Sequence, residues 1–204
     1  MNIDLSELSP NQTYHVLTQT IVPRPIGWVL SRNADRGLNL APFSYFNAVG
    51  SSPAMVIISI GPRPDGTPKD TRRNIEARPD FVVHIAHGAL VEMVNASSAS
   101  MPPETSEVDA LGLRTVELEG SPVPRLADAR VALACRLHRI VEIGSAPQAL
   151  LIAEVHHMYL ADEVVARDDK GRLRIDAAGL DPLARLGASE YALLGEVRTL
   201  ARPK

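Results

Sequence analysis

The chain has 204 residues, of which 45% are hydrophobic and 22% are charged, and its formal net charge is -3 at pH 7. This composition is ordinary for a globular protein, and the slightly negative charge gives no electrostatic reason to expect a nucleic acid partner. Cys135 is the single cysteine, which excludes an intramolecular disulfide and a metal cluster built from cysteines. The length predicts one domain over residues 1–204.

The start of the chain has no pattern of an export signal. Residues 1–10 contain neither a basic segment nor an apolar run. No apolar run in the sequence approaches the roughly 18 residues that a membrane-spanning helix needs. We therefore expect a cytoplasmic protein that has no membrane partner. Residues 5–20 contain Pro10 and polar interruptions, which predict a peripheral arm or a short helix.

The first clear strand pattern follows two prolines. Pro23 and Pro25 favour an extended entry into residues 26–31, where apolar side chains recur at every second position. Residues 33–37 then supply the Asn, Asp and Gly of a turn. This order predicts a hairpin between the first strand and a second one over residues 38–43.

A buried strand, a loop and a helix are expected next. Residues 54–60, AMVIISI, are too short and too rich in β-branched side chains to favour a helix. Residues 61–68 contain three prolines and two glycines, which predict a rigid loop. A helix over residues 72–77 should follow, with Asp70 or Thr71 capping its first turn.

The second half of the chain predicts a long hairpin. Residues 131–143 alternate apolar and polar side chains as a half-buried strand does, and residues 150–159 return as its partner. The other expected elements are a strand at 81–86, helices at 89–98 and 104–113, the latter a short helix or an irregular excursion, and a turn at 168–171. Six or seven strands without regular alternation with helices predict a mainly β protein, an antiparallel barrel with helical excursions.

The start of the predicted helix at 72–77 is a candidate anion site. Lys69, Asp70 and Thr71 combine an ammonium group, a hydroxyl and free backbone N–H groups, a set that suits a phosphate monoester. Any capped helix next to basic residues has a similar pattern. A plain helix cap therefore stays open as the alternative.

A second candidate region lies between the two apolar runs. Ser44 and Asn47 stand among Phe43, Tyr45 and Phe46, a combination that could hold a flat heterocycle and hydrogen-bond its polar edge. The alternative is a loop capped by Ser and Asn with aromatic side chains in the core. Trp28, the single tryptophan, is likewise either a core residue or the wall of a ring site.

The histidines and the cysteine do not point to chemistry. His84 and His87 are three residues apart on a strand, so they should face opposite sides, which does not favour a metal site. Cys135 falls on the apolar face of its strand and is expected to be an inert core thiol. The sequence also lacks the glycine-rich or nucleophile motifs of hydrolases, P-loop proteins and Rossmann folds, so the chemistry would have to come from a cofactor.

Four segments occur in a familiar order. They are RPIGWVLS (24–31), NLAPFSYFNAVGSSP (39–53), KDTRRNI (69–75) and PLARLGASEY (182–191). With them the chain resembles the flavin reductase-like, FMN-binding split-barrel family of the flavoredoxin type, over roughly residues 12–195. The resemblance implies a Greek-key-like antiparallel split barrel that binds FMN without a covalent bond, usually as a homodimer with the cofactor near the subunit interface.

The resemblance also implies roles for individual residues. One group would line the ring or contact its polar edge, namely Trp28, Val29, Leu30, Ser31, Ala41, Pro42, Phe43, Ser44 and Asn47. Ser59 and Gly61 would lie beside the cofactor at a strand end. The ribityl chain and phosphate would be held by Lys69, Asp70, Thr71 and Asn74. Arg185, Gly187 and Tyr191 match the C-terminal pattern and are candidates for a lid, although GAS replaces the second glycine that is common there.

The implied function is that of an oxidoreductase. FMN would accept a hydride from NADH or NADPH at its N5 atom and pass electrons to free flavin or another acceptor, so no catalytic side chain is expected. An alternative is an FMN-binding electron carrier without efficient NAD(P)H oxidation. A third is a split barrel that has lost its ligand and serves as a dimeric scaffold.

Overall fold

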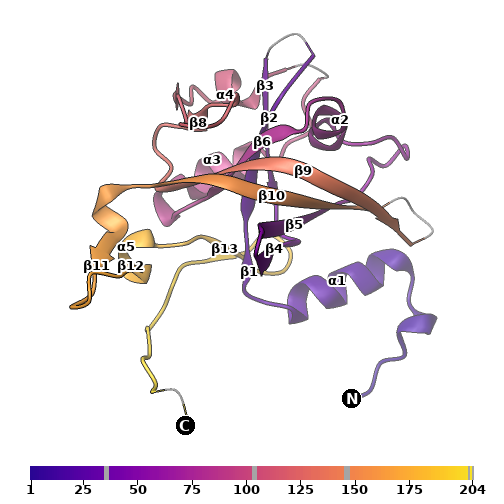
Figure 1. Cartoon of the computed structure of the whole chain (residues 1–204). Helices are drawn as coiled ribbons and strands as arrows, with labels where there is room; N and C mark the ends of the chain where they lie inside the picture. Colours follow the sequence, from indigo (N-terminus) through magenta and orange to yellow (C-terminus); the bar gives the residue numbers. More distant parts are fainter. Residues whose placement is uncertain (35–36, 103–104, 145–147, 202, 204) are drawn as a thin grey trace.

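A seven-stranded antiparallel sheet forms the body of the molecule (Figure 1). The computed structural model describes the whole chain except residues 35–36, 103–104, 145–147, 202 and 204. In spatial order the strands are β3 (Leu38–Phe43), β2 (Gly27–Arg32), β6 (Asp80–Ile85), β9 (Val131–Ile143), β10 (Gln148–Leu160), β5 (Ala54–Ile60) and β4 (Phe46–Ser51). The mainly β, antiparallel architecture expected from the sequence is therefore confirmed.

Smaller elements surround this sheet. The short strands are β1 (Arg24–Pro25), β13 (Ala184–Arg185) and β14 (Tyr191–Ala192) in one sheet, β11 (Val165–Arg167) with β12 (Leu173–Ile175), and β7 (Thr115–Val116) with β8 (Arg125–Leu126). The helices are α1 (Pro10–Thr20), α2 (Asp70–Ala77), α3 (Val91–Ala96), α4 (Glu107–Ala110) and α5 (Ala177–Leu180), with 3-10 turns η1 (Leu5–Glu7), η2 (Gly88–Leu90) and η3 (Asp162–Val164).

The predicted hairpins are present. β2 pairs with β3, and β9 pairs with β10, both antiparallel. Parts of the two connecting turns, residues 35–36 and 145–147, lie outside the described residues. The turn expected at 168–171 joins β11 to β12, and Gly171 adopts there a φ of +73° that a residue with a Cβ rarely takes.

The prediction that β9 is half-buried is wrong for its first five residues, which are buried on both faces. Leu133 and Cys135 pack in one hydrophobic core, whereas Ala132 and Ala134 pack in the other. β9 lies inside the sheet between β6 and β10, so both of its faces are covered there. Alternation indicated one buried face because alanine on the second face is only weakly hydrophobic.

The two faces of the sheet support separate cores. Trp28 and Leu30 of β2 pack in one core, and Val29 between them packs in the other. The Trp28 indole N–H donates to the Ser97 hydroxyl over 2.9 Å, which ties the segment after α3 to the sheet. The side chains of Trp28, Val29 and Leu30 are all 0% exposed, so this part of β2 belongs to the interior of the protein.

The helices differ in detail from the sequence predictions. Residues 5–20 contain a short helix, α1, whose start has a capping box formed by Ser9 and Gln12. The expected helix at 89–98 is divided into η2 and α3, and the excursion at 104–113 contains α4. The longest helix has 11 residues, and none of the described helices is long and apolar enough to span a membrane.

The predicted cap of α2 is wrong. Lys69, in an extended conformation, is the N-cap residue, and its side chain makes no capping hydrogen bond. Asp70 instead pairs with Arg63 and Arg73, and the Thr71 hydroxyl accepts a hydrogen bond from Asn39 over 2.9 Å. Both side chains are thus engaged elsewhere, and neither caps the backbone N–H groups of this turn.

Candidate functional site

Three cavities meet around Pro42 at the end of β3. The first, of about 550 Å³, runs from Pro42 to Lys69 and Thr71 at the start of α2. The second, of about 350 Å³, shares Pro42 and Lys69 with the first and continues to Ser59 of β5. The third, of about 170 Å³, also borders Pro42 and ends at Arg185. Because they share lining residues, the three cavities adjoin one another, and we refer to them together as the depression; basic side chains border it at Lys69 and at Arg185.

Lys69 marks one end of this depression. Within the described part of the chain, no carboxylate lies within ion-pair distance of its ammonium group. Burial lowers the pKa of Lys69, and the neighbouring Arg63 charge lowers it further. The ammonium lies 5.8 Å from the centre of the Phe43 ring. A partly desolvated cation at the N-terminus of a helix stabilises a bound anion, because the ammonium charge and the backbone N–H groups both attract it.

Two carboxylates also line the Lys69 end, and both are already engaged. Asp70 pairs with Arg63 and Arg73. Glu107 of α4 accepts a hydrogen bond from the Leu40 backbone N–H over 2.9 Å, and burial raises its pKa. Glu107 therefore secures the outer edge of β3, which has a sheet partner on only one side.

The middle of the depression is lined by aromatic and small polar groups. Phe43 and Ser44 form one wall. Ser59 and Gly61, at the end of β5, line the same cavity together with Gln148 of β10, whose amide donates to the Ser59 hydroxyl over 2.7 Å. A Cβ at Gly61 would lie 3.0 Å from the Gln148 side-chain oxygen, so this wall is closely packed.

The other end is formed by the C-terminal segment. Arg185 of β13 and Tyr191 of β14 face each other across a two-stranded pairing, with the guanidinium carbon 4.5 Å from the centre of the Tyr191 ring. The buried Arg24 holds this segment in place by donating to the Leu186 carbonyl over 2.7 Å and to the Ile21 carbonyl over 2.8 Å. The two predicted lid residues are therefore brought to the same depression as Lys69.

Some predicted ligand contacts lie behind the cavity wall. Ser31 and Asn74 are 1% and 3% exposed. The Asn74 amide donates to Asn33 over 2.8 Å and to the Ser31 hydroxyl over 3.3 Å, while Asn39 links this group to Thr71. We call these five residues the buried polar network. It joins α2 to β2 and β3, and of its members only Asn39 and Thr71 border the cavity.

The structure also separates other predicted residues from the depression. Trp28, Val29 and Leu30 are fully buried in the two cores. Asn47 is exposed on β4, where its side-chain oxygen accepts a hydrogen bond from the Ala48 N–H over 2.9 Å. The residues that do border it are Ala41, Pro42, Phe43, Ser44, Ser59, Gly61, Lys69, Asp70, Thr71, Arg185 and Tyr191.

Sequence reasoning missed several residues of the site. Arg63 and Gln148 lie in a loop and at a strand start that carry no motif of their own. Glu107 comes from the segment at 104–113, which was expected to be a short helix or an irregular excursion and carries no site motif. Tyr14 reaches the cavity from α1, a helix that looked peripheral. Only the contacts of the folded chain bring these side chains together.

His84 and Cys135 belong to the interior. His84 Nε2 accepts the Leu126 backbone N–H over 3.0 Å, so Nδ1 carries the proton and donates to the Trp28 carbonyl over 3.1 Å. Burial lowers the pKa of His84 to about 4 and raises that of the Cys135 thiol to about 12. Among the described residues, no group of three or more His, Cys, Asp or Glu is arranged to hold a metal ion.

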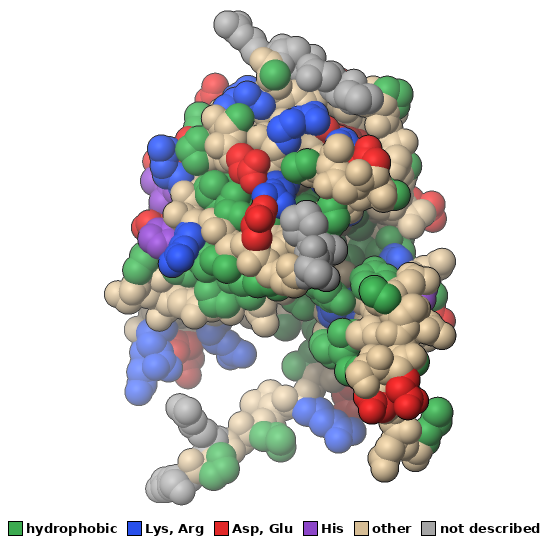
Figure 2. Space-filling model, turned by 90° about the vertical axis from the view of Figure 1, so that its right-hand side faces the viewer, with side chains coloured by type: hydrophobic (Ala, Val, Ile, Leu, Met, Phe, Trp, Pro, Cys, Tyr) green, Lys and Arg blue, Asp and Glu red, His purple; other side chains and the backbone are tan. Residues whose placement is uncertain are grey.

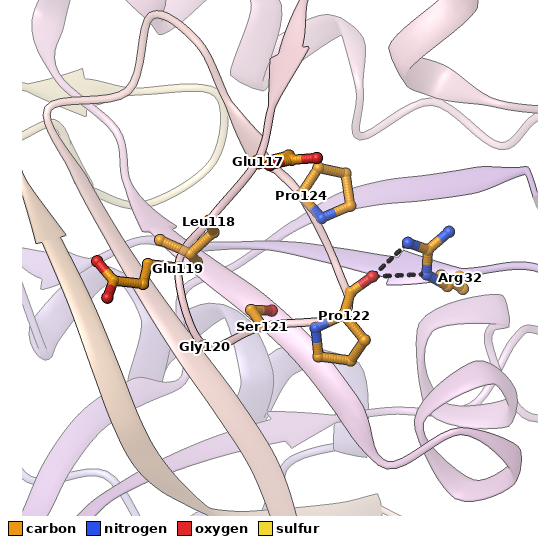
Figure 3. Close-up of a pocket in the computed structure, with 8 residues that line it drawn as sticks. All are labelled: Arg32, Glu117, Leu118, Glu119, Gly120, Ser121, Pro122 and Pro124. Atoms are coloured by element: carbon orange, nitrogen blue, oxygen red, sulfur yellow. Dashed lines mark hydrogen bonds between the residues drawn. The ribbon is translucent and has the colours of Figure 1, made fainter.

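A further cavity, of about 670 Å³, shares no lining residue with this depression and is lined by Arg32, residues 117–122 and Pro124. Figure 3 shows the Arg32 guanidinium directed at the Pro122 carbonyl, to which its Nε donates over 3.2 Å. Glu117 and Glu119 supply the other charges of this cavity. Arg32, the cation among the residues that line this cavity, already donates to the Pro122 carbonyl, so the cavity has no anion site comparable to Lys69.

The surface around α2 carries mixed charge. Arg72 pairs with Glu76 over 2.8 Å and with Glu142, and Arg73 pairs with Asp70. Figure 2 shows basic and acidic side chains next to one another on this side of the molecule. Ion pairs of this kind neutralise one another, so the α2 surface is not a basic patch for a polyanion.

Comparison with known proteins places the chain in a family. The model of the "Flavin reductase like domain" matches residues 19–174. An uncharacterized protein of Halalkalibacterium halodurans is 40% identical, over 100% of this chain and 97% of its own length. An uncharacterized protein of Bacillus subtilis is 38% identical, over 97% of this chain and 96% of its own length.

Solved structures agree with this placement. Nitrilotriacetate monooxygenase component B from Bacillus cereus has a TM-score of 0.90 at 35% identity, covering 98% of both chains. The 2-nitrobenzoate 2-nitroreductase of Pseudomonas fluorescens has a TM-score of 0.88 at 29% identity, covering 100% of this chain and 96% of its own. A flavin reductase with a split-barrel domain from Shewanella frigidimarina, at 19% identity and a TM-score of 0.83 over 98% of this chain and 96% of its own, shares the fold. The chain therefore belongs to the flavin reductase-like family and has its split-barrel fold.

Proposed function

We propose that this protein binds FMN in the depression around Pro42 and acts as a flavin-dependent oxidoreductase. The observation that carries the proposal is the Lys69 end, where a cation that has no carboxylate partner among the described residues stands at the N-cap of α2, next to the backbone N–H groups of the first turn. The cavity continues from there to Phe43, Ser44 and Ser59, a length and chemistry that fit a ligand with an anionic end and a flat ring. The family membership supports the same ligand.

Residues at the two parts of the depression would contact different parts of FMN. Lys69 and the backbone N–H groups of the first turn of α2 would hold the phosphate, and Arg63 would add positive charge nearby. Phe43, Ser44 and Ser59 would border the ring and exclude water from its edge. When bound, FMN supplies hydride and electron transfer at its ring, so no acid–base pair of side chains is required.

We further propose NADH or NADPH as the electron donor and free flavin or another small molecule as the acceptor. The names of two similar structures, a monooxygenase component and a nitroreductase, support a role in supplying electrons to an acceptor. The depression stays open at the Arg185 end beyond the proposed ring position, which leaves room for a second molecule.

Anaerobic mixing of the FMN-loaded protein with each nicotinamide nucleotide tests this function. We expect rapid loss of flavin absorbance with one or both nucleotides, followed by return of absorbance when free flavin is added. Slow loss with both would identify an electron carrier instead. Protein that stays colourless after incubation with FMN would contradict the whole proposal.

We also propose that the protein works as a homodimer. Exposed apolar side chains occur on α1 and its C-cap, on β4 and on the C-terminal segment, among them Ile21 at 60%, Val49 at 54% and Val197 at 58% exposure. Figure 1 shows α1, β4 and the C-terminal segment on the same side of the β9–β10 hairpin, below it in this view. β4 is an edge strand with five of its six residues exposed, a surface that a second copy would cover. Sedimentation should give twice the monomer mass, and Val49→Glu should reduce that mass.

A further inference from the structure

We infer that the cavity ending at Arg185 is a subsite for a small aromatic carboxylate, with Arg185 as the residue that recognises the carboxylate group. This inference rests on the proposed function, because it places the second molecule beside the proposed ring position. The cavity shares Pro42 and Ser44 with the FMN cavity, so a ligand in it would lie against the bound cofactor.

The lining of this cavity is aromatic and apolar except for one charge. Tyr14 and Tyr191 supply aromatic rings, and Ile26 and Val94 supply aliphatic surface. Ser44 and Ser98 add hydroxyl groups, and no lining residue carries a carboxylate. Such a surface favours a flat apolar body with one anionic substituent over a sugar or a cation.

Arg185 is available to an anion. Its guanidinium donates to the Ala188 carbonyl, and within the described part of the chain no carboxylate lies within ion-pair distance of it. A guanidinium has five N–H donors in a fixed plane, so donors remain for the two oxygens of a carboxylate. The Tyr191 ring stacks against the Arg185 guanidinium, which orients the plane of the guanidinium without neutralising its charge.

The hairpin that carries Arg185 is held in one arrangement before any ligand arrives. The Tyr191 hydroxyl bonds to the Asn95 side chain over 3.2 Å, and the Leu186 N–H donates to the Glu190 carbonyl over 3.0 Å. Arg24 fixes the same turn from the buried side. A preformed receptor loses little conformational entropy on binding, which favours recognition of a specific ligand.

The size of the cavity limits the ligand to one ring. Its volume of about 170 Å³ is below the range of sites that enclose drug-sized molecules. A benzoate-like acid matches this size together with the single cation. A nicotinamide nucleotide would bring a phosphate to the same guanidinium, so the two anions have to be distinguished by experiment.

Calorimetric titration of the FMN-loaded protein with benzoate, and separately with benzamide, tests the inference. Benzamide has the same shape without the charge. We expect benzoate to bind about tenfold or more tightly than benzamide, because a charge-assisted bidentate pair is lost with the amide. Equal affinities, or no binding of benzoate, would overturn the inference without any variant being made.

Variants then assign the effect to Arg185. Arg185→Gln should weaken benzoate about tenfold or more, and Arg185→Lys should fall between it and wild type because the charge stays but the planar fork is lost. Arg114→Gln is the matched control, since Arg114 is exposed and paired with Asp128 over 3.1 Å outside the site. Unchanged benzoate affinity in Arg185→Gln would overturn the assignment.

Two further measurements separate the possible failures. Titration with nicotinamide mononucleotide tests whether Arg185 binds a phosphate instead of a carboxylate. If Arg185→Gln weakens the binding of this nucleotide but not of benzoate, the carboxylate inference is overturned. Absorbance titration with FMN tests the proposed function independently. If FMN binds and benzoate does not, only the subsite is wrong. If FMN does not bind, the proposed function is wrong, and the benzoate titration on the protein as purified still decides the subsite.

Discussion

Two polar regions meet at the start of α2, and they differ in how their hydrogen bonds are closed. The buried polar network of Ser31, Asn33, Asn39, Thr71 and Asn74 is closed by bonds between its own side chains. The cavity side presents Lys69, which has no carboxylate partner among the described residues. A satisfied network holds elements together, whereas an unmatched charge facing a cavity is available to a ligand. The types of the residues in the sequence do not by themselves show which polar groups are satisfied inside the protein and which face the cavity.

The largest expected effect concerns His84, a satisfied interior group. Burial lowers its pKa in the folded protein to about 4, below the ordinary value of 6.5 for a histidine, so the unfolded chain binds the proton more readily between these pH values. Stability is therefore complete above pH 6.5 and decreases as the pH falls toward 4, by about 3 kcal/mol in total.

Denaturant unfolding across pH 4–7 measures this effect. The His84→Gln variant is expected to be less stable at neutral pH and to show a shallower loss of stability on acidification. Nuclear magnetic resonance of the imidazole gives the pKa directly. A His84 signal that titrates near 6.5 in the folded protein would contradict the closed hydrogen-bond arrangement.

The next largest effect concerns Lys69 on the cavity side. Lys69→Met removes the charge and keeps much of the apolar stem, so we expect FMN affinity to fall about 10- to 100-fold with little change in stability. Lys170→Met, on the exposed turn between β11 and β12, is the matched control. Fluorescence titration with FMN measures both. Equal affinities of the two variants would remove Lys69 from the site.

The lowered pKa of Lys69 adds a pH dependence to binding. Because partial desolvation favours the neutral amine, the free protein loses this charge at a lower pH than an unperturbed lysine would. FMN affinity should therefore decline as the pH rises into the alkaline range, and the decline should be absent in Lys69→Met. A decline of the same size in that variant would assign the titration to another group.

The smallest effect on binding is expected for the buried polar network. Asn74→Ala removes the bonds to Asn33 and Ser31 and leaves buried partners unmatched, which should lower the free energy of unfolding by about 1–3 kcal/mol. FMN affinity should change less than in Lys69→Met. Asn47→Ala, exposed on β4, is the control and should leave stability nearly unchanged. A larger loss of FMN affinity in Asn74→Ala than in Lys69→Met would reverse the comparison.

Most strands could be predicted because the prolines and glycines that end them lie next to them in the sequence. Prolines and glycines bound the strands at 26–31, 38–43 and 54–60, and the alternation at 131–143 continues through a long hairpin. Strand order was not predictable, because β6 enters the sheet between β2 and β9 through contacts distant in the chain. Burial on both faces of β9 depended on that order as well.

The site was predictable as a region and less so residue by residue. Lys69 and Ser44 were found from their surroundings in the sequence, and both border the depression. Ser31 and Asn74 have the same chemistry, yet they face inward, and the side on which a polar side chain lies depends on packing. Glu107 is brought to the site by tertiary contacts alone, since α4 packs on β3.

The most direct test of the central claim compares FMN with riboflavin, which differs only by the phosphate. If Lys69 and the start of α2 hold the phosphate, the wild-type protein should bind FMN about 10- to 100-fold more tightly than riboflavin. This preference should largely disappear in Lys69→Met and persist in Lys170→Met. A preference for FMN that is unchanged in Lys69→Met would contradict the account.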